Sequence, residues 1–138
     1  MMRMLVVDDD SAWRALYRMA FDDRFEIFEA TDGQHGLAIV DTVNPDVILL
    51  DLRMPRMDGL DFIRRVDDRG AHAPIVVCSG TLNGGEHLSI PGVQLTPKTP
   101  DLRDLWDALR AAVPELALDA TASQAESGAA AEGTVWRD

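Results

Sequence analysis

Four aspartates of the sequence directly follow two apolar runs and could together perform metal and phosphoryl chemistry. Asp8–Asp10 follow the run Met4–Val7, and Asp51 follows the run Val47–Leu50. Carboxylates that lie close together repel one another, and a divalent cation removes that conflict. Mg²⁺ prefers oxygen ligands, and proteins hold it through one or two carboxylates together with phosphate oxygens. These residue types predict a magnesium site, provided that the fold brings the two groups together.

The simpler explanation of each aspartate is a solvated loop residue or a charge at the start of a helix. That explanation suits Asp10, which can serve the beginning of the first helix. It suits the other three less well, because a purely structural domain has no need of clustered acids. We therefore expect Asp8, Asp9 and Asp51 to form the site.

Short apolar runs alternate with amphipathic stretches along the chain, and the runs are the candidates for strands. Nearly continuous apolar runs are typical of strands that are covered on both faces, as in a parallel sheet. The five candidate strands are Met4–Val7, Phe25–Ala30, Val47–Leu50, Ile75–Cys78 and Val93–Leu95.

Helical patterns lie between these runs. The first helix has Ser11 available as its N-cap. Its apolar residues recur at helical spacing, and they are Trp13, Leu16, Tyr17 and Ala20. A second helix is predicted over Gly33–Val43. A third runs from Gly59 to about Arg69, with Asp58 as its cap and with Leu60, Ile63 and Val66 facing inward.

The last helix shows the clearest pattern. Thr99 is its candidate N-cap, Pro100 falls at the first helical position, and Pro114 stops the helix. Its apolar stripe comprises Leu102, Leu105, Trp106, Leu109 and Val113. Between the fourth and fifth strands, by contrast, glycines and a proline leave little room for a helix, so we expect a loop or a short, degenerate helix there.

Repeated alternation of strands and helices implies right-handed βαβ units in an open, doubly wound α/β sheet. In such a sheet the first and third strands are neighbours, and ligands bind outside the carboxyl ends of the strands. Asp8, Asp9 and Asp51 should therefore converge at one edge of the sheet.

Composition narrows the class of protein. The 138 residues suit one domain, and a formal net charge of −11 without a basic cluster argues against direct binding to nucleic acid. No run resembles a signal peptide or could span a bilayer, and the single cysteine excludes an internal disulfide framework. We expect a cytoplasmic protein with a domain over residues 1–114 and a disordered, acidic tail over residues 115–138 that ends near Trp136.

Three motifs occur in order and at suitable spacing: Leu5–Asp9, Ile48–Pro55 and Met57–Gly59. Together they resemble the receiver domain of two-component response regulators, and the similarity extends from about Arg3 to Val113. The resemblance implies a flavodoxin-like fold with five parallel strands in the order 2-1-3-4-5. It also implies phosphorylation by a histidine kinase or a histidine phosphotransfer protein, with Mg²⁺ as cofactor.

The resemblance also assigns roles to residues. Asp51 would be the phosphoacceptor, and Asp8, Asp9 and Asp51 would hold Mg²⁺ with the backbone carbonyl of Arg53. Ser79 and Lys98 occupy the positions where the family stabilises the phosphoryl group, and Arg53 and Thr81 are candidates to modulate dephosphorylation. Lys98 is the only lysine among 13 basic residues, which suggests that its position needs a compact ammonium group.

Two departures from the family pattern concern signalling. Leu95 stands three positions before Lys98, where the family commonly has an aromatic switch residue, and Thr99 replaces the usual proline after the lysine. No output domain follows in the sequence. We therefore expect a stand-alone, non-enzymatic signalling protein that acts on a separate protein target.

Two other functions remain open from the sequence. The chain could be a receiver-like interaction module that acts without phosphorylation. A hydrolase or a flavoprotein on a similar fold is less favoured, since Arg53 stands where a hydrolase needs a second acid and Asp8–Asp10 would repel a flavin phosphate. The three histidines, His35, His72 and His87, lie far apart in sequence and are expected to be exposed and non-functional. Cys78 is expected to be an inert core thiol.

Overall fold

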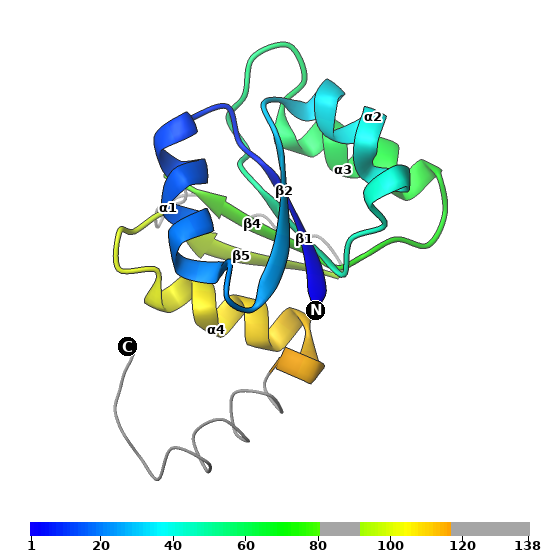
Figure 1. Ribbon diagram of the computed structural model, residues 1–138. Helices are drawn as coiled ribbons and strands as arrows, with labels where there is room; N and C mark the ends of the chain where they lie inside the picture. Colours follow the sequence, from blue (N-terminus) through cyan, green and yellow to red (C-terminus); the bar gives the residue numbers. More distant parts are fainter. Residues whose placement is uncertain (81–91, 117–138) are drawn as a thin grey trace, which may run out of the picture.

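The computed structural model describes residues 1–80 and 92–116, and a five-stranded parallel sheet lies at its centre (Figure 1). The strands lie in the order β2-β1-β3-β4-β5, which confirms the predicted flavodoxin-like topology. Their bounds are β1 Met2–Val7, β2 Phe25–Ala30, β3 Val47–Leu50, β4 Ile75–Ser79 and β5 Val93–Pro97. The order places β1 and β3 side by side, as the position of the candidate site requires.

Helices cover both faces of the sheet (Figure 1). Helix α1 (Ser11–Phe21) and helix α4 (Arg103–Ala112) pack on one face. Helix α2 (Gly33–Val43) and helix α3 (Gly59–Asp68) pack on the other. The sheet is therefore buried on both sides, which explains the nearly continuous apolar runs of its strands.

The core consists of two clusters, and strand β1 contributes to both. Met4 and Val6 face α1 and α4, whereas Leu5 and Val7 face α2 and α3. All four side chains are completely buried. This alternation is the two-residue period of a strand, and here both faces are apolar because both are covered.

Aspartates cap the first three helices. The side chain of Asp10 accepts a hydrogen bond from the backbone N–H of Ala12, so Asp10 and not Ser11 caps α1. This corrects the predicted cap and confirms the structural role expected of Asp10. Asp32 caps α2, and Asp58 caps α3 as predicted.

The start of α4 was predicted wrongly. The helix begins at Arg103 and not next to Thr99, and its N-cap residue is Leu102 in the left-handed conformation, with φ of 58°. Residues 99–102 form a turn that is closed by a hydrogen bond from Leu102 N–H to the Thr99 carbonyl (3.1 Å). The turn buries the Leu102 side chain in the core, and this burial offsets the cost of a left-handed leucine.

The inward face of α3 also differs from the prediction. Ile63 and Val66 are buried as expected, but Phe62 is fully buried and Leu60 only partly so. Phe62 lies against Gly36 of α2, where a Cβ atom would come within 2.9 Å of its ring. A helical period fixes the apolar face only to within about one residue. The space left by Gly36 on the facing helix favours Phe62 over Leu60 as the inward residue.

Helix α4 ends before Pro114, as predicted, and Leu116 beyond it is buried in the core. The short or degenerate helix expected after β4 falls on residues 81–91, which lie outside the described residues, and so do the predicted tail from residue 117 onward and Trp136. In the described part of the chain, we find no helix of the length and apolarity needed to cross a membrane.

Candidate functional site

The carboxylates of Asp8, Asp9 and Asp51 meet at the carboxyl ends of β1 and β3. Backbone hydrogen bonds from Asp8 to Ala30 (3.1 Å) and from Asp51 to Val7 (3.0 Å) hold both aspartates level with the sheet edge. One oxygen from each of the three carboxylates lies within 4.8 Å of the others. Asp8 is 2% exposed and Asp51 7% exposed, whereas Asp9 faces solvent. The convergence expected from the strand order is present.

Lys98 follows the carboxyl end of β5 and joins this cluster at the same edge of the sheet. Its Nζ lies 2.8 Å from Oδ2 of Asp8 and 3.4 Å from Oδ2 of Asp51, and its side chain is almost buried. The backbone N–H of Lys98 donates to the carbonyl of Ser79 (3.1 Å), which fixes the residue at the ends of β4 and β5. Burial alone would lower the pKa of Lys98, but the hydrogen bond to Asp8 and the charges of both carboxylates raise it overall.

Asp51 sits in an electrostatic environment with opposing influences. Burial raises its pKa, Lys98 lowers it, and the neighbouring charge of Asp8 raises it again, so that the pKa lies above its ordinary value. The carboxylate therefore gains from added positive charge at this edge of the sheet. Lys98 supplies one such charge, and a divalent cation would supply more.

A magnesium ion fits this donor set. The ion takes oxygen ligands at about 2.1 Å, so that two oxygens on one ion lie no more than about 4.2 Å apart. The three carboxylate oxygens lie within 4.8 Å of one another, and a small movement brings them to that spacing. Asp8, Asp9 and Asp51 would hold the ion.

The other predicted site residues differ in what the structure describes of them. Ser79 is completely buried at the end of β4, next in register to Pro97. Arg53 is exposed, and its backbone N–H points to Oδ1 of Asp51 at 3.4 Å. Thr81 and His87 lie outside the described residues. The roles assigned to Ser79, to the Arg53 carbonyl and to Thr81 stay predictions.

Gly59 allows the loop after Asp51 to fold back on itself. Its N–H donates to the carbonyl of Leu52 (2.9 Å), and a Cβ atom here would come within 2.8 Å of the Leu52 Cα and 2.9 Å of the Asp51 carbonyl oxygen. Only glycine permits this approach, which anchors the start of α3 beneath the candidate phosphoacceptor.

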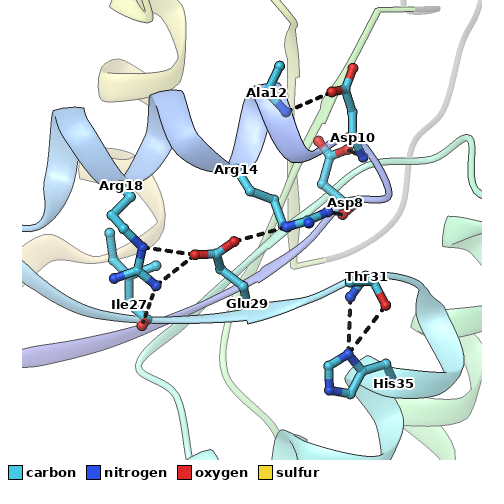
Figure 2. Close-up of polar contacts among 9 residues, drawn as sticks. All are labelled: Asp8, Asp10, Ala12, Arg14, Arg18, Ile27, Glu29, Thr31 and His35. Carbon is cyan, nitrogen blue, oxygen red and sulfur yellow. Dashed lines mark hydrogen bonds and ion pairs between the residues drawn. The ribbon is translucent and has the colours of Figure 1, made fainter.

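An ion-pair network that sequence reasoning missed holds the loop after β1 (Figure 2). Arg14 donates to the backbone carbonyl of Asp8 (2.7 Å) and to Oε1 of Glu29 (2.9 Å). Arg18 binds the other oxygen of Glu29 (2.8 Å), and the backbone N–H of Asp10 donates to Oδ1 of Asp8 (2.9 Å). The backbone and the carboxylate of Asp8 are thus fixed independently.

The two described histidines lie away from the carboxylates and are exposed. His35 accepts a hydrogen bond from the N–H of Thr31, and His72 contacts Asp67. Cys78 is buried, as predicted, and burial raises the pKa of its thiol to about 11. None of these three residues belongs to the site.

A family model described as the response regulator receiver domain matches residues 4–114, which is most of the chain. The chain belongs to the receiver-domain family. Phosphorylation on an aspartate and the use of Mg²⁺ are typical of this family of two-component systems, and the carboxylates of the sheet edge agree with both.

Relatives of this receiver domain have several overall functions. It is 33% identical over 113 residues to the response regulator MprA of Mycolicibacterium vanbaalenii, which covers 79% of this chain and 49% of that protein. It is 35% identical over 96 residues to protein-glutamate methylesterase/protein-glutamine glutaminase 2 of Koribacter versatilis, which covers 67% of this chain and 26% of that protein. The chain thus spans about a quarter to a half of the length of these relatives.

Solved receiver structures share the fold. The response regulator TrrA of Thermotoga maritima, in complex with Mg²⁺-BeF, is 25% identical with a TM-score of 0.72, over 80% of this chain and 97% of that one. The receiver domain of the hybrid histidine kinase CckA is 26% identical with a TM-score of 0.66, over 80% and 98%.

Proposed function

We propose that this receiver domain accepts a phosphoryl group on Asp51 and acts as a stand-alone response regulator. The observation that carries the proposal is the convergence of Asp8, Asp9, Asp51 and Lys98 at one edge of the sheet. A buried carboxylate that shares its surroundings with two further acids and one lysine is suited to a reaction that brings in a phosphoryl group and a cation together.

In the proposed reaction, a carboxylate oxygen of Asp51 attacks the phosphorus of a phosphohistidine on the donor protein. The bond between Asp51 and phosphorus forms as the bond between phosphorus and the imidazole nitrogen breaks, and the imidazole keeps the electron pair and takes a proton. Catalysis of such a transfer consists mainly of positioning and charge neutralisation. Lys98, held 3.4 Å from Asp51, would pair with one phosphoryl oxygen, and the Ser79 hydroxyl would hold another.

Magnesium fits the proposal as a resident cofactor. Asp8, Asp9 and Asp51 would hold the ion together with the backbone carbonyl of Arg53. When bound, it supplies positive charge that offsets the repulsion among the three carboxylates and the charge that develops on the phosphoryl oxygens. Arg53 and Thr81, which flank the site in sequence, would influence how fast water removes the phosphoryl group.

The partners follow from the same chemistry. The solved relative TrrA has been crystallised with the histidine kinase ThkA, and we propose a histidine kinase or a histidine phosphotransfer protein as the donor here. We propose a non-enzymatic role, in which the domain signals through its own phosphorylation on Asp51. A separate cytoplasmic protein, and not nucleic acid, would receive the signal.

One observation favours a second candidate, an interaction module that acts without phosphorylation. Leu95 stands where the family commonly has an aromatic switch residue, and it packs partly buried against the cluster on the face of α2 and α3. An aliphatic side chain packed in this way offers no aromatic ring to turn inward. The phosphorylated state would then change the surface of the domain by another route, or not at all.

Intact mass spectrometry after incubation with acetyl phosphate separates the two candidates. With Mg²⁺, the wild-type protein should gain one phosphoryl group, and it should gain none without the ion or in the Asp51→Asn variant. The matched control is Asp58→Asn, which removes an exposed acid that caps α3. Absence of an adduct on folded wild-type protein would leave the interaction module as the better account.

A further inference from the structure

Lys98 makes a third contact, beyond its two carboxylates. Its Nζ lies 5.1 Å from the centroid of the Trp13 ring. A cation within about 6 Å of an aromatic face is attracted by the ring, and tryptophan gives the strongest such contact. The ammonium group is therefore bounded by Asp8 at 2.8 Å, by Asp51 at 3.4 Å and by an indole ring.

Trp13 is itself fixed by the core. It is partly buried against the cluster beneath α1, and its ring lies 5.9 Å from that of Tyr17 at an interplanar angle of 35°. Tyr17 is 1% exposed, and its hydroxyl donates to Sγ of Cys78 (3.4 Å). The indole therefore packs against a buried neighbour that is hydrogen-bonded to β4. Its face toward Lys98 is held in place by this packing.

We propose that Trp13 is a positioning residue for Lys98. A lysine ammonium is a point charge on a flexible stem and has no built-in orientation toward a phosphoryl oxygen. The indole face removes part of that freedom and keeps the charge between Asp8 and Asp51, where an incoming phosphoryl group would meet it. This inference rests on the phosphoacceptor function proposed above, and it assigns to Trp13 a role beyond filling the apolar stripe of α1.

The alternative is that Trp13 only packs against Tyr17. In that case any side chain of similar bulk would serve, and the aromatic face would be irrelevant. Leucine and phenylalanine separate the two accounts, because both are apolar but only phenylalanine offers a ring face to the ammonium group.

The first experiment measures the rate of phosphorylation by acetyl phosphate with Mg²⁺, per folded protein. We expect Trp13→Leu to slow the reaction about three- to tenfold, in line with the strength of a cation–π contact, and Trp13→Phe to keep most of the rate. The control is Trp106→Leu, which removes an indole of α4 that contacts Arg24 and Arg110, and which should leave the rate unchanged. A Trp13→Leu variant as fast as wild type, or a Trp13→Phe variant as slow as Trp13→Leu, would overturn the inference.

The second experiment reads the contact directly and does not depend on the folding of a Trp13 variant. In a Trp106→Phe/Trp136→Phe background, Trp13 is the only tryptophan, and its emission should change when Lys98 is replaced by Met, with no phosphodonor present. Phosphorylated wild-type protein combined with unchanged Trp13 emission would overturn the role of Trp13 alone. A wild-type protein that takes up no phosphoryl group would instead contradict the proposed function, and with it the role of Trp13.

Discussion

Glu29 shows how a single residue outside the carboxylate cluster supports the site. Its two oxygens bind Arg14 and Arg18 of α1, and Arg14 in turn holds the backbone carbonyl of Asp8. Partial burial raises the pKa of Glu29, but the hydrogen bonds and charges of the two arginines outweigh it, so that the pKa lies below its usual value of 4.5. The charged form of Glu29 therefore stabilises the folded protein.

This pKa shift predicts a pH-dependent stability. Because the folded pKa is depressed, the contribution of Glu29 is fully present above pH 4.5 and is lost as the pH falls through the lower, folded value. Urea unfolding at pH 7 should show Glu29→Gln less stable than wild type by about 1 kcal/mol, and the difference should shrink at lower pH. The control is Glu26→Gln on the same strand, whose exposed, 3.7 Å pair with Arg3 should contribute little. Equal effects of the two substitutions would contradict the role of Glu29.

At the residue scale, the sequence predicted that the three aspartates would converge, and the family resemblance placed Lys98 with them, but neither indicated the residues that support them. Asp8 and Asp51 follow apolar strands, and strand order alone predicts where strand ends meet. The partner of Arg14 lies 15 residues away on another element, and no spacing rule connects them. Trp13 fitted the apolar period of α1 equally well as a core residue, so its contact with Lys98 could be seen only in the folded chain.

At the scale of elements, the start of α4 shows where a local rule fails. The Pro100 and Thr99 pattern predicted a helix from Pro100, but the chain first makes a turn that buries Leu102. Asp101 stabilises this turn, since its Oδ1 accepts hydrogen bonds from the N–H of Arg103 (3.0 Å) and from the hydroxyl of Thr99 (3.2 Å). Tertiary burial decided the boundary, and the helix-start pattern could not foresee it.

Asp101 should therefore act as the cap that Leu102 cannot provide. Asp101→Ala should lower the free energy of unfolding, because the turn and the start of α4 lose a capping carboxylate. Asp104→Ala is the matched control, because it removes an acid from the first turn of the same helix without a capping hydrogen bond. Thermal or urea unfolding of the two variants tests this, and an Asp104→Ala variant that loses as much stability would argue against the cap.

At the scale of the whole molecule, the sequence was sufficient for the topology. The five apolar runs and the amphipathic stretches between them predicted a doubly wound α/β sheet, because βαβ units are right-handed and the runs need cover on both faces. The order 2-1-3-4-5 was implied by the resemblance to receiver domains. The sequence did not predict the exact packing of the two faces. On α3, for example, Leu60 was predicted to face inward, but Phe62 is the residue that is fully buried. Residues on facing helices, such as Gly36, decide such details.

Cys78 reports on the opening of the whole domain. It lies in β4 at the centre of the core, and burial raises the pKa of its thiol to about 11. The native protein should react with Ellman's reagent at least about a hundredfold more slowly than the protein in urea, since both access and thiolate formation require unfolding. A native rate close to the rate in urea would show that the core around β4 opens readily.

The most direct test of the central claim locates the phosphoryl group. The protein is incubated with acetyl phosphate and Mg²⁺, then treated with sodium borohydride, which reduces an aspartyl phosphate to homoserine and releases phosphate, and its peptides are sequenced by mass spectrometry. The proposed function predicts homoserine at position 51 and unchanged aspartates at positions 8 and 9, with no reduction when acetyl phosphate is omitted. Homoserine at another aspartate, or none in folded wild-type protein, would contradict it.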